Sequence, residues 1–266
     1  MKSKLEKKIS LITGGASGIG LAFAQQLVSE NYTVCIVGRN QKKLNEAKQS
    51  ILDLGGQCVT YRGDVSKWDD LTQIADDFKQ KFSSLDLLVV NAGVIYANTV
   101  ADMPIENIES IFQTNLIGAV KTTKLFSPLM PNKSQILFMA SGFGIIGAAG
   151  YASYCASKAG MMVFAESLKR ELLHKKIKVQ VACPADTDTP QYQLEKINKP
   201  SWLRVNKQVN IKSAAKVVSI IRKKQRTNRF FIFTSMDVFI AHFLSKISPR
   251  NFRDMTLNIL LPRPRA

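Results

Sequence analysis

The sequence contains few of the residues on which metal and thiol chemistry depend. Its two histidines, His174 and His242, are too few and too isolated for a metal site or for a serine–histidine pair. No CxxC pair and no metal-ligand spacing occurs among the four cysteines, which are Cys35, Cys58, Cys155 and Cys183. We therefore expect no bound metal, and we expect these cysteines to be reduced structural thiols of a cytoplasmic protein.

Long apolar runs are also absent. The basic N-terminus MKSKLEKK is followed by an apolar run over residues 9–12 that ends at once in TGG, so it is too short for a signal-peptide core. No stretch of roughly eighteen uncharged apolar residues occurs, which argues against a membrane-spanning helix. With 266 residues, of which 45% are hydrophobic and 21% charged, the chain suits one large folded domain. We expect a cytoplasmic protein, either free or peripheral on the cytoplasmic face of a membrane.

Acidic residues are scarce in the last quarter of the chain. Residues 196–266 carry 16 Lys/Arg against 2 Asp/Glu, whereas residues 1–195 carry 21 against 18. Apolar residues recur at helical spacing over 237–247, and a second apolar stretch covers 252–261. Basic residues that flank amphipathic helices suit contact with an anionic lipid surface; closing a subunit interface or capping a pocket is the alternative. No nucleic-acid-binding motif accompanies the charge, so we expect no nucleic acid partner.

Short apolar runs alternate with longer amphipathic stretches along the chain. Strands are predicted at 9–13, 33–37, 57–61, 85–90, 135–140, 178–183 and 230–234, and helices at 18–30, 41–54, 67–82, 105–130, 152–176, 211–224 and 237–247. This alternation predicts an α/β fold: a single Rossmann-like, doubly wound parallel sheet of about seven strands with helices on both faces. We assign residues 1–235 to this domain, including a substrate loop at about 184–210, and residues 236–266 to a basic amphipathic helical C-terminal extension.

The first predicted strand ends in a glycine-rich turn, TGGASGIG. Glycines let the backbone turn tightly and approach a pyrophosphate at the N-terminus of the following helix, although an ordinary strand-to-helix turn is the alternative. The residues expected to bind the cofactor here are Gly14, Ser17, Gly18, Ile19 and Gly20.

Arg39 follows the second predicted strand, where a cofactor with a free ribose 2′-hydroxyl usually meets an acidic residue. We interpret Arg39 as the partner of a 2′-phosphate, with Ser17 as a second contact, so the expected cofactor is NADPH/NADP+. A solvated loop charge is the alternative for Arg39.

Small and polar residues follow the next two predicted strands, at the sheet edge where ligands bind in open α/β proteins. After the third strand, Asp64 precedes Val65 and is placed to accept a hydrogen bond from an adenine amino group. After the fourth strand come Asn91, Ala92 and Gly93. We expect all five residues to contact the cofactor.

A serine, a tyrosine and a lysine follow the fifth predicted strand. Tyr154 and Lys158 are four residues apart, so on a helix they lie on one face, one turn apart. An ammonium beside a phenol favours the phenolate and lowers the tyrosine pKa from about 10 toward neutrality. A glycine-rich loop can fold Ser141 back beside the phenol. The trio suits proton transfer to a carbonyl oxygen, although a surface helix also explains an isolated YxxxK.

Together, TGGASGIG, the NAG at 91–93, and Ser141 with Tyr154-x-x-x-Lys158 resemble the short-chain dehydrogenase/reductase family, in order and spacing from residue 8 to about 190. The resemblance implies an NADP-dependent oxidoreductase acting on CH–OH/C=O groups, with Asn115, Ser141, Tyr154 and Lys158 as its catalytic tetrad. Tyr154 would protonate the substrate oxygen, Ser141 would hydrogen-bond that oxygen, and Lys158 would lower the tyrosine pKa and hold the nicotinamide ribose. Asn115 would anchor a water; a buried residue bonding only the backbone is the alternative.

The resemblance has two further implications. Subunits of the family join through the helices at 105–130 and 152–176, which implies a homodimer or homotetramer. The sixth strand is followed by CPADTDTP, and the cofactor contacts expected there are Pro184, Thr187 and Thr189. Ala185 stands where the family usually has glycine, which puts the local turn in question.

The segment ADTDTP, with a Glu-x-x-x-Lys-Pro stretch at 195–200, is similar to one branch of the family, the 3-ketodihydrosphingosine reductases of sphingolipid biosynthesis. That branch uses NADPH to reduce the ketone of a long-chain amino ketone. Because such a substrate carries an ammonium near the ketone, we expect it to pair with Asp186, Asp188 or Glu195, although the two aspartates alternatively cap turns.

The loop at 142–150 is expected to form an apolar wall for the lipid chain, through Phe143, Ile145 and Ile146. Other substrates stay open, namely a 3-oxoacyl thioester on an acidic carrier protein, a steroid or a retinoid. A non-catalytic, lipid-associated NADP(H)-binding scaffold is the alternative of another class.

Overall fold

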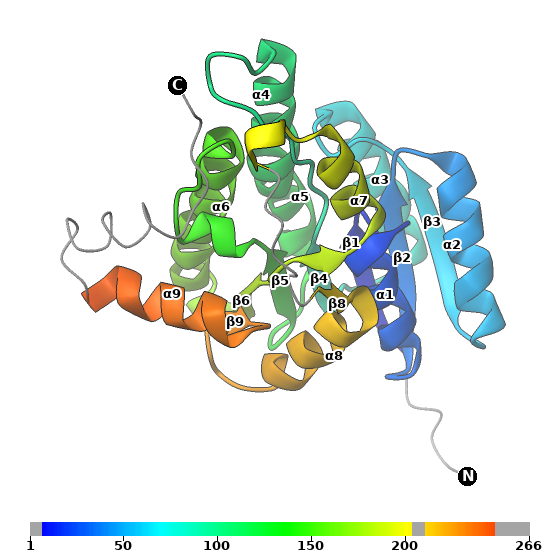
Figure 1. The fold of residues 1–266 in the computed structure, drawn as a ribbon. Coiled ribbons are helices and arrows are strands. Elements are labelled where there is room, and N and C mark those ends of the chain that lie inside the picture. Colours follow the sequence, from blue (N-terminus) through cyan, green and yellow to red (C-terminus); the bar gives the residue numbers. More distant parts are fainter. Residues whose placement is uncertain (1–6, 204–210, 248–266) are drawn as a thin grey trace, which may run out of the picture.

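A parallel seven-stranded sheet forms the centre of the protein (Figure 1). The computed structural model describes residues 7–203 and 211–247. The strands are β1 (Lys8–Thr13), β2 (Tyr32–Gly38), β3 (Gln57–Arg62), β4 (Leu87–Val90), β5 (Gln135–Met139), β6 (Lys178–Cys183) and β9 (Phe231–Phe233). Their spatial order is β3-β2-β1-β4-β5-β6-β9, with every pairing parallel. The predicted sheet is confirmed.

Helices cover both faces of this sheet (Figure 1). On one face, α1 (Gly18–Val28), α2 (Gln41–Asp53) and α8 (Ala214–Gln225) share a buried core. On the other, α3 (Trp68–Lys81), α5 (Gly118–Phe126) and α6 (Ala152–Glu171) share a second core. Neighbouring strand residues serve opposite faces: Leu11 packs into the second core and Ile12 into the first. Because both faces of the sheet are covered, the central strands are mostly apolar, which is why their positions can be predicted.

The strand order places a crevice beside β1. β2 follows β1 on one side, whereas the chain returns on the other side to form β4. In open α/β sheets, ligands bind outside the carboxyl ends of the strands where the order reverses in this way. The glycine-rich turn after β1 and the NAG after β4 therefore lie at the same edge.

The helix predicted at 105–130 is confirmed in extent, but its middle and its end are not α-helical. α4 (Ile105–Phe112) passes into a π-helical segment (Gln113–Ile117) and then into α5, with a 3-10 turn at Ser127–Leu129. Residues in the π-helical segment keep helical dihedral angles, which a hydrophobic pattern does not distinguish from an α-helix. Such insertions are frequent at functional sites, and Asn115 lies in this one.

The helix predicted at 152–176 also ends early. α6 stops at Glu171, a 3-10 turn covers Leu173–Lys175, and Lys176 adopts a left-handed conformation with φ 54°. Three short elements were not predicted: β7 (Thr187–Asp188), β8 (Lys212–Ser213) and α7 (Pro190–Asn198). β7 and β8 pair with each other outside the main sheet, and α7 follows β7 directly. β7 and α7 lie within the segment at 184–210 that is predicted to be the substrate loop, and β8 follows it.

α9 (Met236–Ile247) is the described part of the predicted C-terminal extension. It packs on β9 through rings: Phe239 lies 5.7 Å from Phe233, and His242 lies 4.7 Å from Phe231. The second apolar stretch, at 252–261, lies outside the described residues. Within the described ranges, no helix combines the length and the hydropathy needed to span a bilayer. The four cysteines are free and buried, as predicted.

Candidate active site

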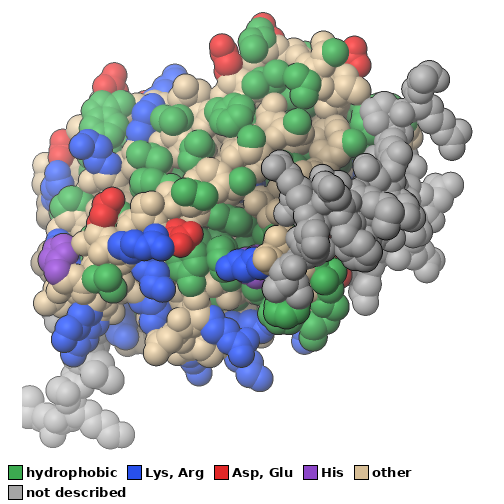
Figure 2. Space-filling view, turned by 90° about the vertical axis from the view of Figure 1, so that its left-hand side faces the viewer, with side chains coloured by type: hydrophobic (Ala, Val, Ile, Leu, Met, Phe, Trp, Pro, Cys, Tyr) green, Lys and Arg blue, Asp and Glu red, His purple; other side chains and the backbone are tan. Residues whose placement is uncertain are grey.

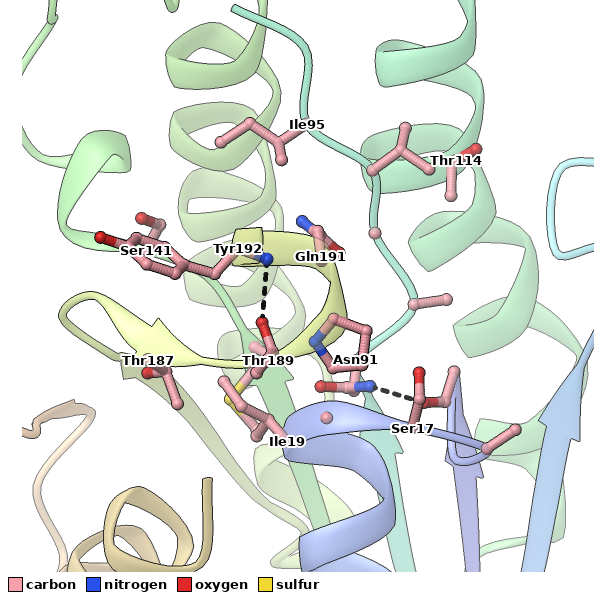
Figure 3. A pocket seen from close by; sticks show the side chains of 18 of the residues that line it. Ser17, Ile19, Asn91, Ile95, Thr114, Ser141, Thr187, Thr189, Gln191 and Tyr192 are labelled. Atoms are coloured by element: carbon pink, nitrogen blue, oxygen red, sulfur yellow. Dashed lines mark hydrogen bonds between the residues drawn. The ribbon is translucent and has the colours of Figure 1, made fainter. Parts of the chain in front are cut away.

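A cavity of about 370 Å³ opens at the carboxyl edge of the sheet. Its walls come from the glycine-rich turn and α1, from the loops after β2 to β6, and from α7. Figure 3 shows the cavity between α1 below and α7 above, with Ile95 and Thr114 on the far side. The two ends of the predicted site, the glycine turn and the Ser-Tyr-Lys trio, therefore line one pocket.

The glycine-rich turn is tied to the end of β4. The Asn91 side-chain amide donates to the carbonyl oxygens of Thr13 and Gly14, at 3.0 and 3.2 Å. Gly14 has φ +65°, a conformation that L side chains rarely adopt, and a Cβ at Gly20 would lie 2.2 Å from the Gly14 oxygen. Only glycine fits at these two positions, so the backbone forms an open cradle.

The start of α1 faces this cradle. Ser17 is the N-cap residue, but its side chain makes no capping hydrogen bond, so it leaves the first amides of the helix to a ligand. The turn and the helix start line the cavity together with Ile19. A cradle that side chains would fill, at a helix N-terminus that attracts anions, fits the pyrophosphate of a dinucleotide.

Arg39 and Asp64 lie together at the end of the pocket beyond this turn. The Arg39 guanidinium is 3.6 Å from the Asp64 carboxylate, and Lys43 lines the same end. Burial acts to raise the pKa of Asp64, but hydrogen bonds from Ser66 and the charge of Arg39 outweigh it, so the pKa lies below its ordinary value. Asp64 is thus an ionised group that holds Arg39 and the Ser66 turn. Its contact with an adenine stays a prediction, as does that of Val65, which also lines the pocket.

Ser141, Tyr154 and Lys158 meet at the other end. Ser141 follows β5 and accepts a hydrogen bond from the Phe143 amide at 3.2 Å, while α6 carries the other two. Tyr154 is 8% exposed and Lys158 is 4% exposed. The Lys158 ammonium donates to the Met139 carbonyl at 2.9 Å and lies 5.7 Å from the centre of the Tyr154 ring. The predicted trio is therefore one cluster on the pocket wall.

The pKa of Tyr154 is shifted opposite to the predicted direction. Burial raises it, and nearby Glu195 and Asp186 raise it further, while the interaction with Ser141 lowers it only in part. Lys158 does not offset this effect, because burial lowers its own pKa to about 8 and its ammonium bonds to a carbonyl. In the protein alone the phenol is the stable form at neutral pH.

Asn115 is fully buried beneath the loop that follows β4. Its side-chain oxygen accepts from the Val94 amide at 2.8 Å, and its side-chain amide donates to the Val94 oxygen and to Ser157. The burial and the two bonds to Val94 agree with the alternative prediction, a buried residue bonding only the backbone, but the bond to the Ser157 hydroxyl does not. Together these contacts fix the Gly93 loop against α6. A water-anchoring role for Asn115 stays a prediction.

The segment after β6 closes the pocket from the side of α7. Pro184 and Thr187 line it, and Thr189 caps α7 by accepting from the Tyr192 amide at 3.1 Å (Figure 3). Ala185 does not have a positive φ. Its amide donates to the Thr234 hydroxyl, so alanine makes this turn without strain.

The structure separates the six predicted substrate residues into two groups. Phe143, Asp186 and Glu195 line the pocket. Ile145 packs on the core of α6 instead, and Ile146 is not among the lining residues. Asp188 also does not line the pocket, because its carboxylate accepts from the Gln193 side chain at 2.8 Å. This contact joins two side chains, and the residue that caps α7 is Thr189, so it does not show the turn capping expected as the alternative for Asp188.

Several residues in or beside the pocket were missed in the sequence. Tyr151 is 6% exposed and donates from its hydroxyl to the Glu195 carboxylate at 2.5 Å. It stands three residues before Tyr154, a helical spacing that indicates the same face. Tyr192 and Ile95 also line the pocket, but nothing in their sequence context distinguishes them from surface residues.

A small apolar core lies over the trio. Tyr151, Tyr154 and Cys155 pack with Leu203, which comes from the end of the substrate loop. Phe143 and Trp202 complete the cluster, and the Phe143 ring lies 4.9 Å from the Tyr151 ring. The reacting end of the pocket is thereby shielded from water on the side of the substrate loop. Among the described residues, no group of three or more His, Cys, Asp or Glu is arranged to hold a metal.

Comparison with known proteins identifies relatives over most of the chain. The family described as short chain dehydrogenase matches residues 8–199. The chain is 35% identical to 3-dehydrosphinganine reductase TSC10B of Arabidopsis thaliana over 195 residues, which are 71% of this chain and 58% of that protein. It is 32% identical to a 3-oxoacyl-[acyl-carrier-protein] reductase of Mus musculus, over 66% of this chain and 74% of that protein.

Solved structures share the fold. A short chain dehydrogenase/reductase from Burkholderia phymatum, in complex with NAD, has a TM-score of 0.80 at 21% identity and covers 99% of both chains. A short chain dehydrogenase from Burkholderia cenocepacia, in complex with NADP, has a TM-score of 0.71 at 22% identity, over 84% of this chain and 91% of that one. The match to the first curated relatives spans only 58 to 63% of their own length.

Proposed function

The chain belongs to the short-chain dehydrogenase family, and from this premise we propose that it is an NADPH-dependent oxidoreductase that reduces the ketone of a long-chain lipid to a secondary alcohol. The observation that carries this proposal is a single pocket that joins a phosphate-sized glycine cradle to Ser141, Tyr154 and Lys158. The proposed reduction needs no further acid or base from outside this pocket.

The cofactor would lie between the two ends of this pocket, held by the glycine turn, the start of α1 and Thr189. Arg39 and Lys43 favour the additional 2′-phosphate of NADPH, because two cations line that end and no acidic residue follows β2 directly. When bound, the reduced nicotinamide supplies a hydride to the carbonyl carbon.

Tyr154 then acts as the proton donor. Its raised pKa keeps the phenol protonated at neutral pH, which is the form that a general acid needs. Ser141 is placed to donate a second hydrogen bond to the same carbonyl oxygen and so to stabilise the negative charge that develops there. With a pKa of about 8, Lys158 gains and loses a proton near neutral pH and can restore the proton that Tyr154 gives up.

The substrate that we favour is 3-ketodihydrosphingosine, reduced to dihydrosphingosine. Support comes from relatives that are named 3-dehydrosphinganine or 3-ketodihydrosphingosine reductases, in Arabidopsis thaliana and Bos taurus. The apolar cluster of Phe143, Tyr151 and Leu203 beside the trio suits an alkyl chain. A 3-oxoacyl thioester is the second candidate, because the Mus musculus relative is named for that activity.

A substrate panel tests this proposal. The purified protein is mixed with NADPH or NADH and with 3-ketodihydrosphingosine, a 3-oxoacyl thioester or a steroid ketone, and cofactor oxidation is followed at 340 nm. We expect the highest kcat/KM with NADPH and the long-chain amino ketone. Preference for the thioester would assign the second candidate. Tight NADPH binding without turnover of any ketone would instead indicate a non-catalytic scaffold.

We further propose that α9 docks on an anionic membrane surface. Five of its apolar side chains are exposed, namely Met236, Phe239, Ile240, Phe243 and Leu244. Nearby, Lys169 and Lys246 lie over the rings of Phe230 and Phe231 at 5.2 and 5.9 Å. Figure 2, which views the side of α6 and α9, shows hydrophobic side chains among Lys and Arg on this face. This mixture of cations and aromatic residues suits an interface with phosphate head groups.

Co-sedimentation with liposomes tests the membrane proposal. We expect binding to vesicles with anionic lipid, weaker binding as salt increases, and loss of binding when Phe239 and Phe243 are both changed to Ser. Equal binding to neutral vesicles, or none to anionic ones, would contradict it. We also propose a homodimer or homotetramer, supported by exposed Ile117 and Val163 on the helices expected at the subunit interface; light scattering gives the subunit count.

A further inference from the structure

Glu195 is held in one position beside the reacting end of the pocket. It lies on α7, and its carboxylate accepts the Tyr151 hydroxyl at 2.5 Å. The Tyr151 ring is fixed in turn, because it is buried and packs 4.9 Å from the Phe143 ring. A carboxylate has two oxygens with several acceptor directions, so the bond from Tyr151 orients Glu195 and leaves it able to accept from a ligand.

The position of Glu195 relative to Tyr154 matters for recognition. Glu195 bonds to Tyr151, which packs in the same small core as Tyr154, and Asp186 lines the same pocket. Both negative charges therefore lie on the side of the Tyr154 phenol, whose pKa they raise. The lining cations Arg39 and Lys43 lie at the other end of the pocket, and the Lys158 ammonium bonds to Met139. A substrate atom close to the reacting carbonyl therefore meets carboxylates.

Among the described residues, the charges near these two carboxylates do not outweigh the effect of burial. Burial raises the pKa of Glu195, even though the bond from Tyr151 and the charge of Lys199 act in the opposite direction. Burial also raises the pKa of Asp186, against the charge of Lys199. A carboxylate that lacks sufficient positive charge in its surroundings gains stability from a cationic ligand.

We propose that Glu195, positioned by Tyr151, selects substrates that carry an ammonium group on the carbon next to the reacting ketone, with Asp186 adding a second negative charge to the same subsite. An ammonium has three donors and no acceptor, so it pairs with carboxylates and is rejected by the apolar walls of the pocket. This inference rests on the proposed ketone reduction and names the group that the site recognises. The alternative is that the Tyr151–Glu195 bond only holds α7 in place and does not recognise the substrate.

Two ketones that differ only at the amine separate these roles. The first is a long-chain 2-amino-3-ketone, and the second is the same chain without the amine. For Glu195→Gln we expect KM for the amino ketone to rise about tenfold to a hundredfold, with kcat changed much less, because a charge-assisted hydrogen bond is lost. Neither parameter should change more than about twofold for the plain ketone. If the Tyr151–Glu195 bond only held α7 in place, Glu195→Gln would change KM and kcat equally for both ketones, and that result would overturn the proposal.

Asp188→Asn is the matched control. It removes one carboxylate of the same loop that does not line the pocket. We expect wild-type kinetics with both ketones; an effect equal to that of Glu195→Gln would show a general loss of negative charge and contradict the assignment. Asp186→Asn should raise KM for the amino ketone by a smaller factor. Tyr151→Phe keeps the ring and should raise KM for the amino ketone severalfold. The kinetics with the plain ketone should not change, because Tyr151 acts only by positioning Glu195.

A binding experiment separates this inference from the proposed reaction. Isothermal titration measures the affinity of the NADP+-loaded protein for a long-chain primary amine and for the alcohol of equal length. Amine binding that weakens tenfold or more in Glu195→Gln, with alcohol binding unchanged, supports the subsite even if no ketone is reduced. Turnover of ketones together with amine binding that is the same in wild type and Glu195→Gln would overturn the subsite and leave the reductase intact.

Discussion

The two ends of the pocket carry charges of opposite sign. Arg39 and Lys43 line the end beyond the glycine turn, whereas Asp186 and Glu195 line the end beneath α7. An anionic group at the first end and a cationic group at the second would each meet complementary charge. The pocket therefore gives its two ligands a defined order along the crevice, because the reversed arrangement would place like charges together.

The two ends also differ in how firmly their charges are held. The Arg39 side chain is 62% exposed and its contact with Asp64 is 3.6 Å long. Glu195 is partly buried and is bonded at 2.5 Å to a tyrosine that is itself buried. Salt screens exposed charges more strongly than buried ones. Recognition at the Arg39 end should thus depend on ionic strength, whereas recognition at the Glu195 end should depend on geometry.

Tyr154→Phe should have the largest effect of any change, because it removes the proposed proton donor. It removes the hydroxyl and keeps the ring of a residue that packs with Tyr151 and Phe143. We expect kcat to fall by about a thousandfold, the usual contribution of a positioned general acid. NADPH affinity, measured by fluorescence titration, should stay within a few fold. A variant that keeps more than a tenth of the wild-type kcat would exclude Tyr154 as the proton donor.

Arg39→Ala tests the basic end. We expect KM for NADPH to rise about tenfold with KM for NADH unchanged, because one charge-assisted contact to the 2′-phosphate is lost. The difference should shrink when the salt concentration increases, since the side chain is exposed. Lys42→Ala is the control, because Lys42 precedes Lys43 without lining the pocket. An equal rise in KM for NADPH and for NADH would instead assign Arg39 a structural role through its contact with Asp64.

Lys158→Met tests the charge of the buried lysine beside Tyr154. Burial lowers the pKa of Lys158 to about 8, so above that pH the native state has released a proton that the unfolded chain still binds. Stability therefore rises with pH through this window, by about 1 kcal/mol between pH 8 and 9 for a single group. Urea denaturation at about pH 8 and about pH 9 measures the free energy of unfolding, and its increase between the two should be smaller in Lys158→Met than in the wild type.

The exposed Lys48→Met is the control for this measurement and should keep the wild-type pH dependence. Comparing the variants cancels the contribution of Cys35, whose raised pKa acts in the same region of pH with opposite sign. It does not cancel that of Cys183, because the charge of Lys158 lowers the pKa of this thiol. A Lys158→Met variant with the full wild-type rise would show that Lys158 keeps its proton when the chain folds.

The basic end of the pocket follows from local sequence pattern, whereas the acidic end was predicted only as a choice among Asp186, Asp188 and Glu195, of which Asp186 and Glu195 line the pocket. Glycines, Arg39 and Asn91 directly follow buried strands, and the carboxyl ends of parallel strands meet at one edge, so local pattern determines where these residues lie. Glu195 lies on α7, a helix that the sequence did not indicate, and its position depends on a bond to Tyr151, 44 residues away. Periodicity carries no information about such a contact.

Burial explains the other differences between prediction and structure. The spacing of Tyr154 and Lys158 correctly placed them on one helix face, but the predicted pKa shift considered only the attraction between ammonium and phenolate. Both groups are more than nine-tenths buried, and desolvation of the charged forms dominates. Asn115 is also fully buried, and it makes its bonds to Val94 and Ser157 from a π-helical segment, which a hydrophobic pattern does not distinguish from an α-helix.

Asp188→Asn should have the smallest effect, and it tests whether the acidic end depends on charge or on position. Asp188 lies two residues from Asp186, but its carboxylate accepts from Gln193 and stays outside the cavity. Because Asp188 precedes the N-cap of α7, the substitution should cost about 0.5 kcal/mol of stability in urea denaturation, from the lost interaction with the helix dipole. Kinetics with amino and plain ketones should match the wild type within about twofold, since an exposed charge beside solvent is screened. A selective rise in KM for the amino ketone would place Asp188 in the subsite and show that the sum of the charges on this loop, rather than the bond from Tyr151 to Glu195, recognises the amine.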